Sequence, residues 1–139
     1  MKRVFLILTL ALGLLLACDK SNSEPEVLKN EIRKASTQLE DDQLLSDLYL
    51  EILSLSTSYT CSDESDWKYT AIGAKACGGP AAYIAYSIKL DVGAFLAKVS
   101  FYTHQQEAYN IKWGIVSDCD IPPEPNGVSC EEGNAILQY

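Results

Sequence analysis

The first 17 residues of the chain have the pattern of an export signal, and this pattern constrains the folding of everything that follows. Lys2 and Arg3 form a positively charged start, and residues 4–17 are apolar apart from one threonine and one glycine. The apolar run is shorter than the ~20 residues that a helix needs to span a bilayer, and it has the length of the hydrophobic part of a signal peptide. We therefore expect residues 1–17 to be removed and the rest of the chain to fold outside the cytoplasm.

The residues at the expected cleavage point resemble the lipobox of bacterial lipoproteins. Leu15, Leu16 and Ala17 precede Cys18, and in that family cleavage leaves the cysteine as a diacylated first residue. The resemblance implies a lipid on Cys18, and two or more acyl chains anchor a protein stably where one chain does so only marginally. We expect Cys18 to hold the protein on a membrane of the bacterial cell envelope, facing the periplasm or the exterior. An ordinary secretory signal and an uncleaved anchor are the alternatives.

The chain that remains is sized for one domain. Removing 17 of the 139 residues leaves 122, enough for one compact domain and too few for two of ordinary size. The polar residues 18–26 predict a flexible tether, followed by a single domain over residues 27–139. The mature chain keeps nine of the 11 basic residues and all 19 acidic ones, a formal charge of −10. Nucleic acid and anionic membrane surfaces attract clusters of Lys and Arg, so this charge argues against both as partners and favours solubility or a basic partner.

Four cysteines remain after Cys18, and in an exported chain an even number predicts disulfides. They allow three pairings and are Cys61, Cys77, Cys119 and Cys130. The segment between the last two is rich in turn-forming residues, and closing a loop near that length contributes roughly 3 kcal/mol in the chain-entropy model. We therefore favour Cys119 with Cys130 and, by elimination, Cys61 with Cys77. A zinc site is the alternative, but the chain has no CxxC spacing and one histidine, so we expect no metal.

Apolar spacing predicts three helices. Residues 27–39 and the stretch that follows Glu40-Asp41-Asp42 carry apolar residues at helical spacing. Acidic residues are favoured in a first helical turn, so Glu40-Asp41-Asp42 predicts a break and a new helix start. Residues 48–52 also alternate as in a strand, but the length of the segment favours a helix. Asp91 suits the N-cap of a third helix that continues to Tyr109.

Short strands are expected in the second half of the chain. The polar residues 61–66 predict a turn or a short helix, and residues 67–71 alternate as in a half-buried strand. Residues 81–87 fit either a strand or a helix, and further strands are expected at 115–116 and 135–139. The predicted fold class is α+β, a single small disulfide-stapled domain with N-terminal helices followed by short antiparallel strands around one further helix.

The sequence contains little evidence for a set of catalytic residues. His104 is the single histidine and is expected to be an exposed helix residue, and no serine lies in a GxSxG elbow. Gly78-Gly79-Pro80 lacks the GK[ST] of a phosphate loop and predicts a tight turn. Two acidic clusters could supply calcium ligands, but a solvated acidic face is the better explanation; they are Asp63, Glu64 and Asp66, and Asp118, Asp120, Glu131 and Glu132. We expect no catalytic residues and no cofactor.

The proline-rich segment between the last two cysteines is the sharpest candidate for recognition. We expect it to be stiff and exposed, with its ends held by a disulfide; its residues are Pro122, Pro123, Glu124 and Pro125. A preorganised loop loses little entropy on binding, which favours affinity. A loop of this kind is also an ordinary way to complete a small exported domain.

Aromatic residues are numerous for a chain of this length, with eight tyrosines and two tryptophans. Such residues are favoured at binding surfaces, and they also fill small cores. We expect the second use for Trp67, Tyr69 and Trp113.

One stretch resembles a group of small bacterial lipoproteins of unassigned function. Its most specific part is Lys-Ala-Cys-Gly-Gly-Pro at residues 75–80, and it extends through Tyr109-Asn110 and residues 115–119. The similarity covers residues 61–130, about half of the chain. The resemblance implies membership of this group and supplies no activity and no site residues.

These patterns predict a membrane-anchored extracytoplasmic lipoprotein that acts as a binding or inhibitor module, with an envelope or extracellular protein as partner. An extracytoplasmic hydrolase is one alternative, and it needs a cleft with two convergent carboxylates. An accessory subunit of an envelope assembly is the other, and it needs an exposed apolar patch beyond a few hundred Å².

Overall fold

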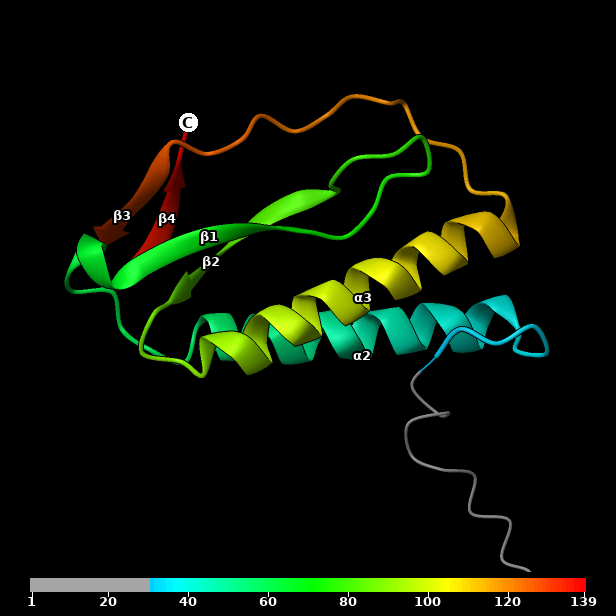
Figure 1. The fold of residues 1–139 in the computed structure, drawn as a ribbon, viewed down its shortest axis with the longest axis horizontal. Helices are drawn as coiled ribbons and strands as arrows, with labels where there is room; N and C mark the ends of the chain where they lie inside the picture. Colours follow the sequence, from blue (N-terminus) through cyan, green and yellow to red (C-terminus); the bar gives the residue numbers. More distant parts are fainter. Residues whose placement is uncertain (1–30) are drawn as a thin grey trace, which may run out of the picture.

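The computed structural model describes residues 31–139; the predicted signal, the predicted lipid site Cys18 and the predicted tether all lie outside the described residues. Two antiparallel hairpins, β1–β2 and β3–β4, form separate two-stranded sheets. The elements are α2 (Gln38–Ser56), a short 3-10 helix η1 (Glu64–Asp66), β1 (Trp67–Ile72), β2 (Ala82–Ser87), α3 (Val92–Trp113), β3 (Gly127–Glu131) and β4 (Asn134–Gln138) (Figure 1). The predicted α+β class is confirmed.

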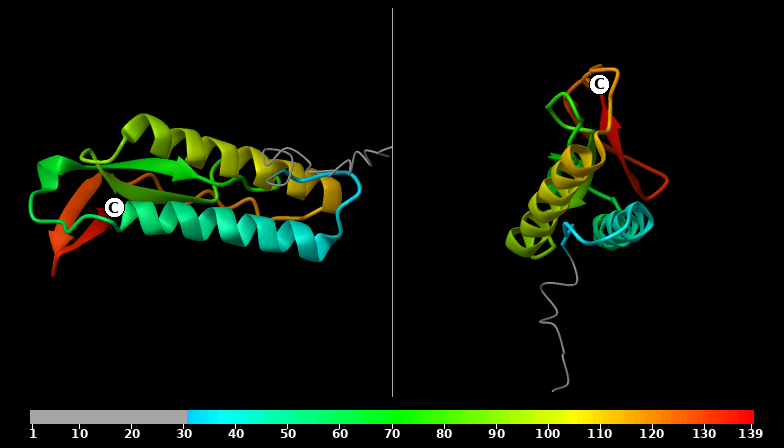
Figure 2. Two further views of the ribbon diagram at one scale, coloured as in Figure 1. Left: turned by 90° about the horizontal axis from the view of Figure 1, so that it is seen from below. Right: turned by 90° about the vertical axis from the view of Figure 1, so that its right-hand side faces the viewer.

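The domain is layered. The helices α2 and α3 lie side by side and run in opposite directions (Figure 2, left), and β1–β2 covers one face of the pair. The β3–β4 hairpin lies on the other side of β1–β2 (Figure 1). The core fills the space between the helices and β1–β2 and consists of Ile52, Phe95, Val99, Ile72, Ile84 and Tyr86. Because side chains alternate along a strand, the residues between these on β1 and β2 face the hairpin.

The helix α2 begins at Gln38, ahead of the predicted start. Thr37 is its N-cap: the Thr37 side chain accepts a hydrogen bond from the amide of Glu40, and the Glu40 carboxylate accepts one from the amide of Thr37 at 2.7 Å. This reciprocal capping box defines the first turn. The predicted helix over 27–39 is wrong for residues 31–37, which are not helical. In that segment the carbonyls of Arg33 and Ser36 accept hydrogen bonds from Lys112 instead.

The other elements agree with the sequence except after α3. Asp91 caps α3 by accepting a hydrogen bond from the amide of Ala94. The short helix η1 lies within residues 61–66, and the strands predicted at 67–71 and 135–139 overlap β1 and β4 to within one residue at each end. The ambiguous residues 81–87 contain the strand β2. The strand predicted at 115–116 is wrong, because these residues follow α3 as an irregular segment and have no strand to pair with in the described chain. The strand β3 was not predicted, since the prolines before it indicate a loop.

The four cysteines form two disulfides, but in pairs other than those favoured from the sequence. Cys61 is bonded to Cys130, with a Cα–Cα distance of 5.2 Å, and Cys77 to Cys119, with 5.7 Å. The favoured pairing is wrong because the segment between Cys119 and Cys130 runs along the domain and enters β3. The β3–β4 turn then lies against Cys61, whose amide donates a hydrogen bond to the carbonyl of Gly133 at 2.8 Å.

Gly73 is the point where the chain leaves β1, and polar residues of α3 hold the backbone there. The amide of Gly73 donates to the Thr103 hydroxyl at 3.0 Å, and the amide of Ala74 donates to Oε1 of Gln106 at 2.9 Å. The side-chain amide of Asn110 donates to the carbonyl of Ala74 at 2.8 Å. These α3 side chains therefore position the loop at residues 75–80.

Gly73→Ala is expected to destabilise the protein more than Gly114→Ala does. Both glycines have a left-handed backbone, with φ of +73° and +59°, which costs an alanine about 1–2 kcal/mol. A Cβ at Gly73 would also clash with Oε1 of Gln106, which accepts the hydrogen bond from the amide of Ala74. Among the described residues, by contrast, no heavy atom lies within 4 Å of a Cβ at Gly114. Urea unfolding of the two variants measures the difference, and equal losses would contradict the close approach at Gly73.

Candidate functional site

A cleft of about 550 Å³ opens between α2, β2 and the β3–β4 hairpin. Figure 2 (right) shows the hairpin and α2 on the same side of the domain. The volume lies within the range of small-ligand sites, which is ~300–1,000 Å³. Four aromatic side chains contribute to its lining, and they are Tyr49, Tyr59, Trp67 and Tyr83.

The helix α2 forms one wall of the cleft. Tyr49, Leu53 and Ser56 recur at the spacing that places side chains on one face of a helix, and all three line the cleft. The neighbouring Ile52 is buried in the core, but Tyr49 and Leu53 are 39% and 37% exposed. This face of α2 therefore leaves apolar side chains uncovered beside the core.

The β3–β4 hairpin forms the opposite wall of the cleft. Ala135 and Leu137 of β4 line this wall together with Trp67, which is 8% exposed. The Cys61–Cys130 disulfide joins the hairpin to the chain that follows α2. This bond and the packing of the hairpin against β1–β2 together hold the hairpin over the cleft.

Tyr83 connects the cleft to the proline-rich segment. Partial burial raises the pKa of the Tyr83 hydroxyl, and the nearby carboxylate of Glu124 raises it further. The rings of Tyr83 and Tyr69 meet edge to face, with centroids 6.1 Å apart. The carboxylate of Glu124, a predicted recognition residue, is therefore close enough to interact electrostatically with a residue that lines the cleft.

The proline-rich segment is less exposed than the sequence predicts. Pro125 is one of the most deeply buried side chains and Pro122 is half-buried, so the prediction that the whole segment is exposed is wrong. Its end is held by backbone pairing, in which the amide of Asn126 donates to the carbonyl of Gln138 at 2.7 Å. Only Pro123 and Glu124 of the four predicted binding residues are exposed.

The acidic clusters are engaged in local interactions. Asp63 caps η1. Hydrogen bonds from the Ser65 hydroxyl and, second, from the Ser65 amide lower the pKa of the Asp63 carboxyl. Asp66 forms an ion pair with Lys89 at 2.6 Å, and Asp118 one with Lys75 at 3.0 Å. Within residues 31–139, no group of three His, Cys, Asp or Glu residues is placed to hold a metal ion.

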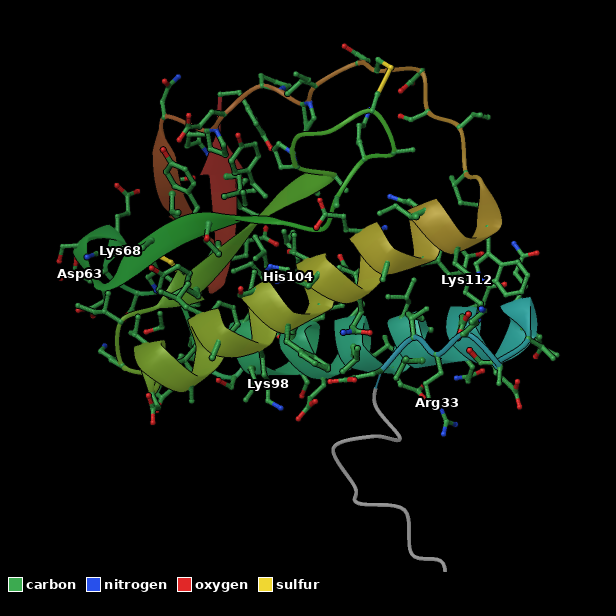
Figure 3. All side chains as sticks on the ribbon, turned by 45° about the vertical axis from the view of Figure 1, so that its right-hand side comes forward. Arg33, Asp63, Lys68, Lys98, His104 and Lys112 are labelled. Carbon is green, nitrogen blue, oxygen red and sulfur yellow. A yellow bond between two sulfur atoms is a disulfide. The ribbon has the colours of Figure 1, made fainter. Side chains whose placement is uncertain are left out.

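A buried ion pair lies at the other end of α2 from the cleft. Asp41 is 1% exposed, and its carboxylate accepts hydrogen bonds from Lys112 at 2.6 Å, from the Trp113 indole at 2.9 Å and from the Ser36 hydroxyl at 2.6 Å. Burial raises the pKa of Asp41, but these hydrogen bonds outweigh it, so the pKa lies below its ordinary value. Figure 3 shows Lys112 near the end of α3 and Arg33 on the segment ahead of α2. This cluster fixes that segment to the helices.

The remaining predicted residues have structural positions. His104 is exposed on α3, as predicted, and its Nδ1 lies 2.7 Å from the carbonyl oxygen of Ser100. Trp67 is buried, whereas Tyr69 and Trp113 are half-buried outside the main core. The abundance of tyrosine was the one sequence signal for the aromatic cleft, but nothing in the sequence assigned Tyr49 and Tyr59 to it.

A second hollow, of about 460 Å³, lies between α2 and α3 and includes Leu48, Ile52 and Phe101 in its lining. Its charged residues are paired with each other, since Lys98 and Glu51 form an ion pair at 2.7 Å. Its walls are helix faces alone. The cleft beside β2 offers more varied groups to a ligand and is therefore the stronger candidate.

The comparisons with known proteins leave the site to be argued from geometry. No family model matches the chain, and no curated protein or solved structure shows significant similarity to it. Neither helix within residues 31–139 combines the length and the apolar character needed to cross a membrane.

Proposed function

We propose that this protein is a lipid-anchored binding module of the bacterial cell envelope that holds its ligand in the cleft between α2, β2 and the β3–β4 hairpin. The observation that carries the proposal is that Tyr49, Leu53 and Tyr59 remain between 37% and 42% exposed in a hollow of ligand size. Exposed apolar side chains that gather in a concave site are typical of binding sites. The resemblance of residues 61–130 to small bacterial lipoproteins stays a prediction that agrees with this role.

Binding is favoured over hydrolysis by the charges in the cleft. A glycosidase-type reaction needs two carboxylates on opposite sides of the substrate. Among the described residues that line the cleft, Glu132 alone carries a charge. The cleft therefore offers apolar, aromatic and hydroxyl groups to a ligand without an acid–base pair.

The anchor is tested at Cys18. We expect the wild-type chain, expressed in bacteria, to enter the membrane fraction and to incorporate radiolabelled palmitate, and Cys18→Ser to lose both properties because the acylated thiol is absent. Two disulfides are consistent with the oxidising compartment that this anchor implies. Mass spectrometry of the membrane-bound protein provides the decisive measurement, and an unmodified amino terminus would contradict the anchor.

The cleft is tested by a matched pair of substitutions on α2. Leu53 lines the cleft, whereas Leu50, which is 56% exposed, does not. On glycan and peptide arrays, Leu53→Gln is expected to bind roughly tenfold more weakly than the wild type, since burying a leucine contributes about 1.5 kcal/mol or more. Leu50→Gln is expected to bind as the wild type does. Equal binding by the two variants, or no ligand on either array, would refute the cleft as the site.

A further inference from the structure

The free edge of β2 faces the cleft. Among residues 31–139, the strand β2 pairs with β1 alone, and Tyr83, Ile84 and Ala85 line the cleft. An unpaired strand edge presents a row of N–H and C=O groups that can pair with another chain. The wall that β2 contributes is therefore made of backbone groups as well as side chains.

The ladder shows which backbone groups are free. The amide of Ile88 donates to the carbonyl of Asp66 at 2.8 Å, and hydrogen-bonded pairs recur at every second residue of an antiparallel ladder. By this bond, the residues of β2 that bond to β1 are Ala82, Ile84 and Tyr86. The longer bond from the amide of Ala81 to the carbonyl of Gly73, at 3.4 Å, lies beyond the ladder, where the backbone of Gly73 is left-handed with φ of +73°. The N–H and C=O groups of Tyr83 and Ala85 point away from β1, towards the cleft.

This edge has none of the usual protection. Proteins commonly blunt a free edge with lysine or proline, and the opposite edge strand β1 carries Lys68 (Figure 3). The strand β2 has the sequence Ala-Tyr-Ile-Ala-Tyr-Ser, with no charge and no proline. An open, uncharged edge beside exposed apolar side chains suits a partner that pairs with it.

We propose that the ligand of the cleft is an extended segment of a partner protein that adds to β2 as a third strand, an inference that rests on the proposed function. Strand addition obtains affinity from main-chain hydrogen bonds and specificity from pockets for alternate side chains. Successive side chains of the added strand would point to opposite faces. One set would meet Leu53 and Ser56 of α2, and the other would meet Trp67 and Leu137 on the side of the hairpin.

The charge of the cleft defines the chemistry of the segment. Of the described residues in the lining, Glu132 alone is charged, and the mature chain has an excess of ten acidic residues. An acidic segment would be repelled, and a lysine or arginine beside Glu132 would be attracted. The partner segment is therefore apolar at alternate positions and basic at one end.

Two proline substitutions distinguish binding at the free edge of β2, which faces the cleft, from binding at the free edge of β1, on the opposite side of the same sheet. Ala85→Pro removes an N–H that faces the cleft, and Ala71→Pro removes one that faces outward from β1. Neither residue belongs to a hydrogen-bonded pair of the β1–β2 ladder, and proline is tolerated at strand edges. The two variants therefore differ in which edge they block.

The probe is an array of eight-residue peptides with alternating valine and threonine, ending in lysine in one set and in glutamate in the other. Wild type and Ala71→Pro are expected to bind the lysine set, and Ala85→Pro to bind it about tenfold more weakly because one main-chain hydrogen bond is lost. In the wild type, hydrogen exchange at the amides of Tyr83 and Ala85 should slow at least tenfold when a peptide from the array is added. This measurement requires no variant to fold.

Each other outcome has a distinct meaning. If a glycan binds, and Leu53→Gln weakens it while Ala85→Pro does not, the cleft remains the binding site and strand addition is overturned. Binding of the glutamate set alone, or of no peptide, also overturns strand addition. A dimer seen by light scattering that Ala85→Pro abolishes would assign the edge to a second copy of the chain and overturn the peptide partner.

Discussion

Asp41→Ala is expected to lower the free energy of unfolding by about 3–5 kcal/mol, the range measured when one partner of a buried ion pair is removed. The substitution leaves the Lys112 ammonium and the Trp113 indole without the carboxylate that accepts their hydrogen bonds. It also removes the hydrogen bond that the Ser36 hydroxyl donates to Asp41 from the segment ahead of α2. Urea unfolding followed by circular dichroism measures the loss.

Asp47→Ala is the matched control for this experiment. Asp47 is an exposed aspartate on the same helix, and its carboxylate accepts a hydrogen bond from Gln43 at 2.8 Å. Exposed contacts of this kind contribute little, so the control is expected to unfold close to the wild type. Lys112→Met removes the partner charge but also the donor to the carbonyls of Arg33 and Ser36, so a double-mutant cycle with Asp41→Ala is needed to isolate the coupling between Asp41 and Lys112. Similar losses for Asp41→Ala and Asp47→Ala would show that the buried pair is not stabilising.

The pH dependence of stability provides an independent check on Asp41. Its pKa is lower in the folded protein than its ordinary value, which is about 3.9 in an unfolded chain. Its contribution to stability is therefore complete above that pH and is lost as the pH falls towards the folded pKa. Below about pH 4 the wild type should lose stability more steeply than Asp41→Ala. Parallel pH profiles would contradict the lowered pKa.

Removing the Cys61–Cys130 disulfide is expected to cost about 4 kcal/mol in the chain-entropy model. The bond joins residues 69 positions apart and attaches the β3–β4 hairpin to the rest of the domain. A two-stranded hairpin is at best marginally stable alone, so the hairpin should lose hydrogen-exchange protection in Cys61→Ala/Cys130→Ala. The cleft should lose ligand binding with it, because the hairpin is one of its walls.

Cys77→Ala/Cys119→Ala is the matched control for the disulfide. This bond spans 42 positions and both cysteines are exposed, whereas Cys61 is 3% exposed. The control should be destabilised less and should keep the protection of the hairpin. Non-reducing peptide mapping by mass spectrometry first establishes the pairs. A peptide that links Cys119 to Cys130 would overturn both expectations.

Local signals account for the elements that were predicted correctly. Asp91 caps α3 by accepting a hydrogen bond from an amide three residues away. The alternation of apolar and polar residues over 67–71 predicts a strand whichever strand it pairs with. The start of α2 was placed too late because the capping box of Thr37 and Glu40 was not recognised beside the neighbouring acids. The strand β3 is not evident from the sequence, because three prolines precede it and it begins with Gly127, and these residues are typical of a loop.

The candidate site was less accessible to sequence analysis than the fold. Its walls come from α2, β2 and β4, which are far apart in the chain, and Tyr49 and Leu53 belong to an apolar pattern that looks the same whether a face is buried or open. Of the residues proposed for recognition, Glu124 was placed near the cleft and Pro125 was placed in the interior. Exposure depends on neighbours that the local sequence does not contain.

The amino-acid sequence by itself determined the α+β class, the number of disulfides and most helix and strand positions, because caps, alternation and cysteine count act within a few residues or on composition. Only the tertiary structure decided which cysteines pair, which face of α2 stays open and which edge of β2 is free. These features depend on contacts between distant segments, where the packing of the hairpin against β1–β2 outweighs loop length. Loop-closure entropy changes slowly with length, so spacing alone could not select the pairs.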